Sequence, residues 1–420
     1  MLSPARAVVR WGCLAAALAF LLSIAPVAAA DDLPRAEPAE VGLDPTALEK
    51  IDAAVEGHIA KKEIAGAITV VARKGKVAYL KSFGAFKDDS ILRIYSMTKP
   101  IAVVAALILV DEGKLGLDDP VSKFIPGFAD LKVQGGTGEP KPMTVKHLMQ
   151  HTAGLTYGFF GNTPIDQRYR SLNVLDKDSS LEAMASKLAG VPLMFEPGTR
   201  WHYSVSIDVL GRVVEVAAKQ PFDVFLQKRL FGPLGMNDTA FHVPAAKAKR
   251  LVPNYAGRSF PIEKPETSPY LKKPGLMSGG GGLVSTARDY TIFCLMLAHG
   301  GTWNGTRILK EASVRAMTTN QLPKALVPIR FGPRAMPGLG FGLGVSVRVS
   351  GANATNTVGE WGWAGAASTF FFVAPEKDLI VINLTQRMPL WNGLDRSVRP
   401  LVYAALESRA AKREPVGAGK

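Results

Sequence analysis

The sequence predicts a mixed α/β fold, in which both ends of the chain build one lobe and a mostly helical lobe is inserted between them. Two observations predict it. Strand-like runs occur early, over residues 67–84, and again in the last third of the chain. From Ser96 to about Pro265 the pattern is mostly helical, with Pro and Gly breaks. Because strands distant in sequence commonly share one sheet, we expect a single α/β lobe from the two ends.

A helix is expected to open the folded part of the chain. Asp44 is a suitable cap and Pro45 suits the first helical position. Leu48, Ile51 and Val55 then recur at helical spacing. These residues predict an amphipathic helix that buries its apolar face.

Further elements follow in order. The run AITVVARKGKVAYLKSFG has two β-rich halves around the turn signal RKGK at residues 73–76, which predicts a hairpin. Residues 204–219, SVSIDVLGRVVEVAAK, form the clearest amphipathic helix pattern. Later, GLGVSVRVS, STFFFVAP and LIVINLTQ read as strands, and GLDRSVRPLVYAALESRAAK closes the chain as a helix.

Residues 1–30 are expected to be a signal peptide. Arg6 and Arg10 precede an apolar stretch from Cys13 to Ala25, and three consecutive alanines end the segment. The stretch is shorter than the roughly 20 residues that a membrane-spanning helix requires, and no later run is a second candidate. We therefore expect an exported protein, periplasmic or secreted, without stable membrane insertion.

One domain is expected over residues 31–408. Its α/β lobe would comprise about 41–95 and 270–408, and its helical lobe about 96–269. The last segment, residues 409–420, is rich in basic residues and is expected to be a disordered tail.

Charge and cysteine usage exclude some functions. The formal net charge is +14, but its basic residues are scattered and form no aromatic-interleaved patch or known nucleic-acid module, so no nucleic-acid partner is expected. Beyond the leader Cys294 is the only cysteine, so no internal disulfide can form, and its flanks IFCLML predict a buried thiol. The six histidines show no metal-ligand spacing, so neither a metal nor another cofactor is expected.

A serine and a lysine stand three residues apart where a long apolar run begins. Pro100 is tolerated only in the first turn of a helix, which places the helix start at or just before Ser96. Ser96 and Lys99 then share one helical face, with the helix N-terminus aimed at whatever reacts with Ser96. The following IAVVAALILV is apolar all round, which predicts a buried helix. On this pair alone, a capping serine beside a snorkelling lysine is the favoured interpretation.

Further motifs follow in order: SMTKP, HLMQHTAGLTYG, FEPGTRWHYSVSIDVLGRVVE, GLMSGGGGLVSTARDY and GEWGWAGAASTFFFVAPE. Together they resemble the serine β-lactamase and penicillin-binding-protein superfamily, and most of all its family VIII carboxylesterases. The resemblance covers about Val41 to Leu406. It implies a β-lactamase/transpeptidase-like fold, with an antiparallel sheet flanked by the N- and C-terminal helices.

The resemblance also implies catalytic roles. The serine of S-x-x-K is the superfamily's nucleophile, so Ser96 would be acylated with Lys99 as its proton partner. Tyr203 matches the tyrosine of the second motif, Y-x-N. A phenol ordinarily loses its proton near about pH 10, but a cationic Lys99 close by would favour the phenolate, so Tyr203 could act as the base. A core aromatic residue is the alternative interpretation of Tyr203.

The third motif, usually K-T-G, matches residues 363–365, which implies that Trp363 and Gly365 bind substrate. The amide of Ala366 would complete the oxyanion hole together with the amide of Ser96. Two positions depart from the family pattern: Val205 replaces the asparagine of Y-x-N, and Trp363 replaces the lysine of K-T-G. Both departures favour neutral esters over substrates that carry a carboxylate. Plain sheet packing is the alternative interpretation of Trp363.

Three functions stay open at this point. The first is a carboxylesterase for short-chain neutral esters. The second is a class C-like β-lactamase or D-amino-acid peptidase on the same scaffold. The third is a non-catalytic protein that binds cell-wall peptides or penicillin. The expected partner is a small-molecule ester or β-lactam-like substrate, and the sequence does not indicate an oligomeric state.

Overall fold

The structure is a computed structural model that describes Met1 and residues 33–138, 141–257 and 260–410. The expected signal peptide lies outside the described residues apart from Met1. Helix α11 (Gly393–Ala410) includes the first two residues of the expected tail, and the rest of that tail lies outside the described residues.

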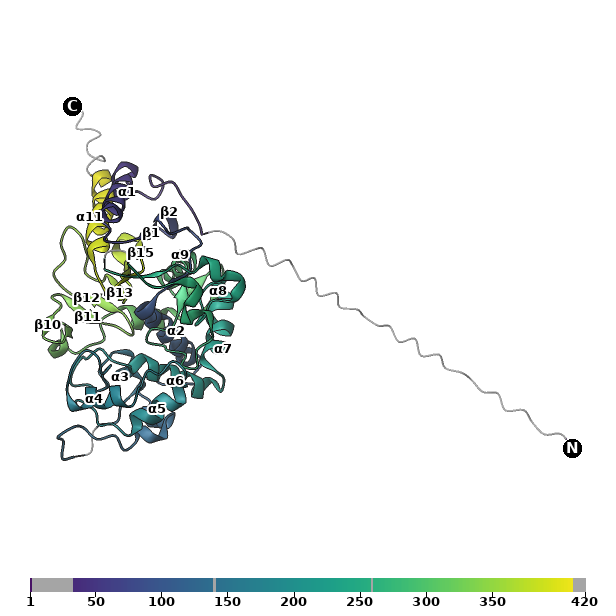
Figure 1. Ribbon diagram of the computed structural model, residues 1–420, viewed down its shortest axis with the longest axis vertical. Coiled ribbons are helices and arrows are strands. Elements are labelled where there is room, and N and C mark those ends of the chain that lie inside the picture. Colours follow the sequence, from purple (N-terminus) through teal and green to yellow (C-terminus); the bar gives the residue numbers. More distant parts are fainter. Residues whose placement is uncertain (2–32, 139–140, 258–259, 411–420) are drawn as a thin grey trace, which may run out of the picture. The chain divides into compact units, whose positions relative to one another are not determined.

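Seven strands form one sheet in the order β11-β12-β13-β14-β15-β1-β2 (Figure 1). All neighbouring pairs in it are antiparallel, and strands from both chain ends meet where β1 (Gly66–Arg73) pairs with β15 (Leu379–Leu384). The expected shared antiparallel sheet is thereby confirmed. The other strands of the sheet are β2 (Lys76–Gly84), β11 (Leu339–Phe341), β12 (Ser346–Arg348), β13 (Trp361–Gly365) and β14 (Thr369–Ala374).

Strands β1 and β2 form the hairpin expected around residues 73–76, and two residues make its turn. Lys74 and Gly75 both have positive φ, of 52° and 75°. Two successive residues in this region give a turn whose twist matches that of the two strands. A side chain at Gly75 would also place its Cβ 2.8 Å from the Nε2 atom of His299, so glycine fits this turn for two reasons.

Helices cover both faces of the sheet, because the inner strands are apolar on both sides. Helix α1 (Pro45–Ala60) and helix α11 run side by side on one face (Figure 1), where Val71 and Val381 point towards them. Ile380 and Ile382 belong to the opposite core, which includes α9 (Ala287–Ala298). This alternation explains why β1 and β15 have no polar face.

Helix α2 (Thr98–Asp111) is the central helix of that larger core. Every residue from Thr98 to Leu109 is buried, which confirms the expected buried helix. It packs against α6 (Ser206–Ala218), the helix expected from the amphipathic pattern at 204–219. The remaining helices are α3 (Val145–Met149), α4 (Pro164–Ser171), α5 (Leu181–Ala189), α7 (Phe222–Leu226), α8 (Gly232–Leu234) and α10 (Glu311–Thr318).

The end of the expected helical segment is instead a small sheet. Its strands are β4 (Asn254–Ala256), β5 (Phe260–Glu263) and β16 (Arg387–Met388), in the order β16-β4-β5. Prolines at 253, 261 and 265 are incompatible with a continuous helix here. Further short strands pair two by two: β3 (Leu92–Arg93) with β6 (Val284–Ser285), β7 (Thr302–Trp303) with β8 (Thr306–Arg307), and β9 (Arg330–Phe331) with β10 (Arg334–Ala335).

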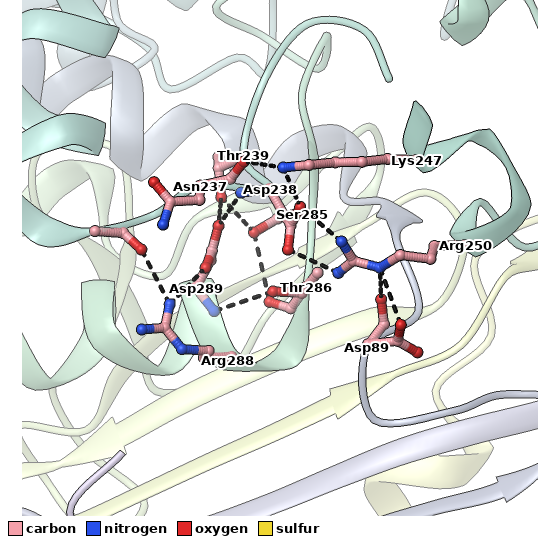
Figure 2. Close-up of polar contacts among 11 residues, drawn as sticks. Asp89, Asn237, Asp238, Thr239, Lys247, Arg250, Ser285, Thr286, Arg288 and Asp289 are labelled. Carbon is pink, nitrogen blue, oxygen red and sulfur yellow. Dashed lines mark hydrogen bonds and ion pairs between the residues drawn. The ribbon is translucent and has the colours of Figure 1, made fainter. Parts of the chain in front are cut away.

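A network of charged residues ties the start of α9 to the segment before β4 (Figure 2). Asp238 binds Arg250 through two contacts of 2.9 and 2.7 Å, and Lys247 through one of 2.7 Å. The Asp238 amide donates to Asp289, in the first turn of α9, at 2.8 Å. Burial raises the pKa of Asp238, but the hydrogen bonds from Arg250 and Lys247 outweigh burial and hold this pKa below its ordinary value.

Replacing Arg250 by Met is expected to lower the free energy of unfolding by about 1–3 kcal/mol at neutral pH, because Asp238 loses its bidentate partner. A carboxyl whose pKa is lowered by folding contributes stability above its unfolded pKa, and this contribution disappears as pH falls through the folded value. The difference between wild type and variant should therefore shrink below about pH 4. Urea unfolding at several pH values measures it, and a difference independent of pH would contradict the role given to Asp238.

Candidate active site

Ser96 lies on a single 3-10 turn, Tyr95–Met97, directly before α2. The α-helix itself begins at Thr98, two residues later than Ser96, so the expected start is slightly too early. The cause is Tyr95, whose φ of +42° is left-handed and cannot continue a right-handed helix. Such backbone strain in a non-glycine residue is typical of functional sites.

The strand before Ser96 is held by a fully buried arginine. Arg93 donates through Nε to Glu263 at 2.8 Å and through Nη1 to the Val252 carbonyl at 2.7 Å. Its own amide donates to Gln386 at 3.0 Å. The Tyr95 hydroxyl accepts a hydrogen bond of 2.9 Å from the amide side chain of Asn254. The small sheet around β4 therefore fixes the backbone that carries Ser96.

Ser96, Lys99 and Tyr203 converge, although Tyr203 is distant from the other two in sequence. The Lys99 ammonium lies 3.1 Å from the Ser96 Oγ atom, and the Tyr203 hydroxyl lies 2.7 Å from the same atom. The Lys99 Nζ atom also sits 4.5 Å from the centre of the Tyr203 ring. One serine oxygen thus contacts a cation and a phenol, which is the arrangement needed to remove and return its proton.

Aromatic packing fixes the ring of Tyr203. It lies 4.8 Å from the His151 ring and 5.5 Å from the Trp363 ring, measured between centres. His151 is fully buried, and burial followed by the charge of Lys99 lowers its pKa well below the ordinary value. His151 is therefore neutral, and it contributes packing to this site without adding a charge.

The other residues expected at the site fall into two groups. Ala366 lines the cavity beside Ser96, and Gly365 packs so closely on the preceding segment that a Cβ would lie 2.3 Å from the Ile94 carbonyl oxygen. Trp363 and Val205 are not among the described residues that line this cavity. The ring of Trp363 packs against the ring of Tyr203.

Val205 was expected to bind substrate, and its position does not support that role. It is 0% exposed, belongs to the large core, and directly precedes α6. Its amide donates to the Thr156 carbonyl oxygen at 3.3 Å. The sequence resemblance assigns Val205 to the second motif, but the side chain at this position lies in the core.

The cavity beside Ser96 has a volume of about 320 Å³. Ser96 and Tyr203 line it, as do Lys177 and Glu263. Phe159 is 59% exposed and Phe160 is 62% exposed, so both stand at an open side of the cavity. A mostly apolar cavity next to a polar reactive group suits an uncharged organic substrate. The apolar lining residues are Phe159, Phe160, Leu175, Phe241, Pro269, Pro274 and Leu276.

Two residues of the site were not singled out from the sequence. Asp208, in the first turn of α6, is 0% exposed and accepts from the Ser278 hydroxyl at 2.5 Å and from the Gly280 amide at 3.0 Å. Tyr157 lies near it: a Cβ on Gly280 would be 2.3 Å from the Asp208 Oδ2 atom and 2.8 Å from the Tyr157 hydroxyl. The sequence feature that could have identified Asp208 is its position as an aspartate among the apolar residues of SVSIDVLG.

Burial dominates the acid–base behaviour of both residues. It raises the pKa of the Asp208 carboxyl, while the nearby Lys99 charge lowers it. Burial, together with the neighbouring Tyr203 and Asp208, raises the pKa of Tyr157 well above its ordinary value. Tyr157 therefore keeps its proton at neutral pH, where it acts as a hydrogen-bonding group.

Within the described ranges, no group of three or more His, Cys, Asp or Glu side chains is placed to hold a metal ion. No helix in the same ranges is both long enough and apolar enough to span a membrane. Cys294 is buried and unpaired, and burial raises the pKa of its thiol.

Comparisons with known proteins agree with this geometry. The family model described as Beta-lactamase matches residues 51–403. Protein Rv1367c of Mycobacterium tuberculosis is 34% identical over 351 residues, which cover 78% of this chain and 86% of the relative. Esterase EstB of Burkholderia gladioli is 34% identical over 238 residues, covering 52% of this chain and 60% of its own. The solved structure of EstCE1, a hydrolase with promiscuous acyltransferase activity, has a TM-score of 0.73 at 27% identity and covers 85% of this chain and 99% of its own.

Proposed function

The chain belongs to the Beta-lactamase family of serine hydrolases, and on this premise we propose that it is a carboxylesterase that cleaves short-chain neutral esters through an acyl-enzyme on Ser96. The single observation that carries the proposal is the pair of contacts on Ser96, 3.1 Å to Lys99 and 2.7 Å to Tyr203, beside a mostly apolar cavity. The likeness to EstB and to EstCE1 supports an ester as the substrate.

The proposed reaction has two halves. In the first, Tyr203 takes the proton of Ser96 as the serine oxygen attacks the ester carbonyl, and it then gives this proton to the departing alcohol. In the second half, a water molecule loses a proton to Tyr203 and attacks the acyl-enzyme, and Ser96 recovers the proton as the acid leaves. Lys99 remains cationic throughout and stabilises the phenolate form of Tyr203.

Two amides are proposed to hold the oxyanion. The Ser96 amide lies just before α2, and the Ala366 amide follows β13 (Trp361–Gly365), which packs against the Ser96 turn. Preorganised donors of this kind are commonly the largest single contribution to acyl-transfer catalysis. The close approach of Gly365 to Ile94 supports the placement of the second amide, because a larger residue there would push β13 away from the turn.

The wild-type protein is expected to hydrolyse p-nitrophenyl butyrate with a kcat/KM at least about 10² times those for nitrocefin and ampicillin. A β-lactam presents a carboxylate beside its reactive ring, and the third motif here supplies Trp363 in place of a lysine. Leaving a charge desolvated without its partner costs about 3–5 kcal/mol. Steady-state rates from one preparation, with the Ser96→Ala variant as the blank, measure the ratio.

The same measurement separates the alternatives. Higher kcat/KM for the β-lactams would favour the class C-like β-lactamase, and cleavage of D-alanyl-D-alanine peptides in preference to both would favour the peptidase. A relative 25% identical to this chain is described as a putative D-alanyl-D-alanine carboxypeptidase. A covalent adduct that forms but does not turn over would favour the binding protein.

We propose that the mature enzyme acts outside the cytoplasm, as a periplasmic or secreted protein. The support is the sequence pattern of the first 30 residues, with Arg6 and Arg10 before the apolar stretch. Cell fractionation followed by N-terminal sequencing tests this proposal. An uncleaved N-terminus in the cytoplasmic fraction would contradict it.

A further inference from the structure

Asp208 and Lys99 are linked through one glycine. The Gly280 amide donates to the Asp208 Oδ1 atom at 3.0 Å, and the carbonyl oxygen of the same residue accepts from the Lys99 ammonium at 2.5 Å. Both side chains are 0% exposed. The backbone at Gly280 therefore bridges a buried anion and the buried cation that contacts Ser96.

No residue larger than glycine fits at position 280 in this arrangement. A Cβ would lie 2.3 Å from the Asp208 Oδ2 atom and 2.8 Å from the Tyr157 hydroxyl oxygen. The Oδ2 atom is buried and has no hydrogen-bond partner, so half of the carboxylate faces the interior of the site unneutralised. The catalytic steps proposed above give this carboxylate no role.

An isolated ion in a protein interior is unfavourable, and a lysine without a counter-charge tends to lose its proton. Lys99 makes no direct ion pair among the described residues, so its charge needs support through a longer contact. The charge of Lys99 is also felt at Asp208, where it lowers the pKa against the effect of burial. Such coupling is reciprocal, because each charge stabilises the other equally.

We propose that Asp208 is a positioning residue that keeps Lys99 cationic and thereby sets the pH range in which Ser96 reacts. The inference rests on the assignment of Ser96 as the nucleophile, and it is independent of which acyl group the enzyme accepts. Asp208 contacts none of the reacting atoms. It acts through Gly280 and the charge of Lys99.

The groups around Asp208 are Lys99 from α2, Tyr157 from the segment before α4, and Ser278 and Gly280 from the loop before β6. Tyr203, from the segment before α6, neighbours Tyr157 and Lys99. Lys99 is the only basic side chain among them. Removing the negative charge of Asp208 therefore makes both the Lys99 ammonium and the Tyr203 phenol lose their protons more readily.

The test is the pH dependence of Ser96 labelling by a fluorophosphonate in wild type and in Asp208→Asn. Asparagine keeps the Oδ1 acceptor for Ser278 and Gly280, and it removes only the charge. Both limbs of the pH profile are expected to move to lower pH by about one unit. Asp289→Asn, which removes another buried carboxyl far along the chain in α9, is the matched control and should leave both limbs in place.

If the pH profile of Asp208→Asn has its two limbs at the same pH values as wild type, the proposal is overturned, whatever the labelling rate. A merely structural role of Asp208 would lower the labelling rate without shifting the pH profile. Should this variant fold poorly, the carbon-13 titration of the Asp208 carboxyl gives the reverse measurement. Its midpoint should rise by about one unit in Lys99→Met, and an unchanged midpoint would equally refute the coupling. Labelling does not require ester turnover: a wild type that is labelled at Ser96 yet cleaves no ester would contradict the proposed function alone.

Discussion

Replacing Ser96 by Ala is expected to abolish ester hydrolysis, lowering kcat by a factor of about 10⁴ or more, and to prevent labelling by a fluorophosphonate. Losing the nucleophile of an acyl-enzyme mechanism removes the covalent pathway altogether, and only the contribution of binding and the oxyanion hole remains. The Ser96 side chain is small and partly exposed, so the variant should unfold at nearly the wild-type temperature. Steady-state kinetics, mass spectrometry of the labelled peptide and a thermal scan check these three expectations.

Ser397 provides a matched control for this prediction. Its hydroxyl lies 2.8 Å from the Nε2 atom of His58, whose Nδ1 atom lies 2.6 Å from Glu63, so successive contacts link a serine, a histidine and a carboxylate. However, Ser397 sits within α11, beyond its first turn, where the backbone amides donate to the helix itself and are not aimed at an oxyanion. Ser397→Ala should keep wild-type turnover, and a label found on Ser397 would contradict the assignment of Ser96.

The sequence predicted the elements whose patterns are local. Asp44 does cap α1, accepting from the Thr46 amide at 2.9 Å, and the apolar run after Lys99 does form a buried helix. The shared sheet could also be anticipated, since β1 and β15 are apolar on both faces and need cover on both sides. Periodicity and capping act over a few residues, so a single sequence is enough to reveal them.

Contacts between distant segments were harder to anticipate. Val205 aligns with a motif position, yet the turn into α6 directs its side chain into the core, which no spacing rule reveals. Asp208 and Tyr157 meet only because Gly280, far along the chain, leaves room for both. The left-handed Tyr95 likewise depends on Arg93 and Asn254 being held by a small sheet that the sequence did not predict.

Replacing Tyr203 by Phe is expected to lower kcat by about 10²–10⁴ with little change in KM, because the hydroxyl serves proton transfer and the ring serves packing. The hydroxyl donates to Ser96 at 2.7 Å, whereas the ring keeps its neighbours His151 and Trp363 in the variant. The free energy of unfolding should therefore change by less than about 1.5 kcal/mol, the usual net contribution of one hydrogen bond. Single-turnover kinetics with p-nitrophenyl butyrate and urea unfolding of the same preparation measure both quantities.

Tyr79→Phe is the control that separates catalysis from the simple loss of a tyrosine hydroxyl. Tyr79 lies on β2, donates to Asp52 at 2.6 Å and lines no part of the cavity beside Ser96. Its loss should affect stability to a similar degree and leave kcat unchanged. Equal rates for wild type and Tyr203→Phe would remove Tyr203 from the mechanism and leave Lys99, 3.1 Å from the Ser96 oxygen, as the group that must take the proton. In that case Lys99 would have to be neutral in the resting enzyme. A buried Asp208 anion favours the opposite, cationic state of Lys99. The rate of Tyr203→Phe therefore also tests the charge assigned to Lys99.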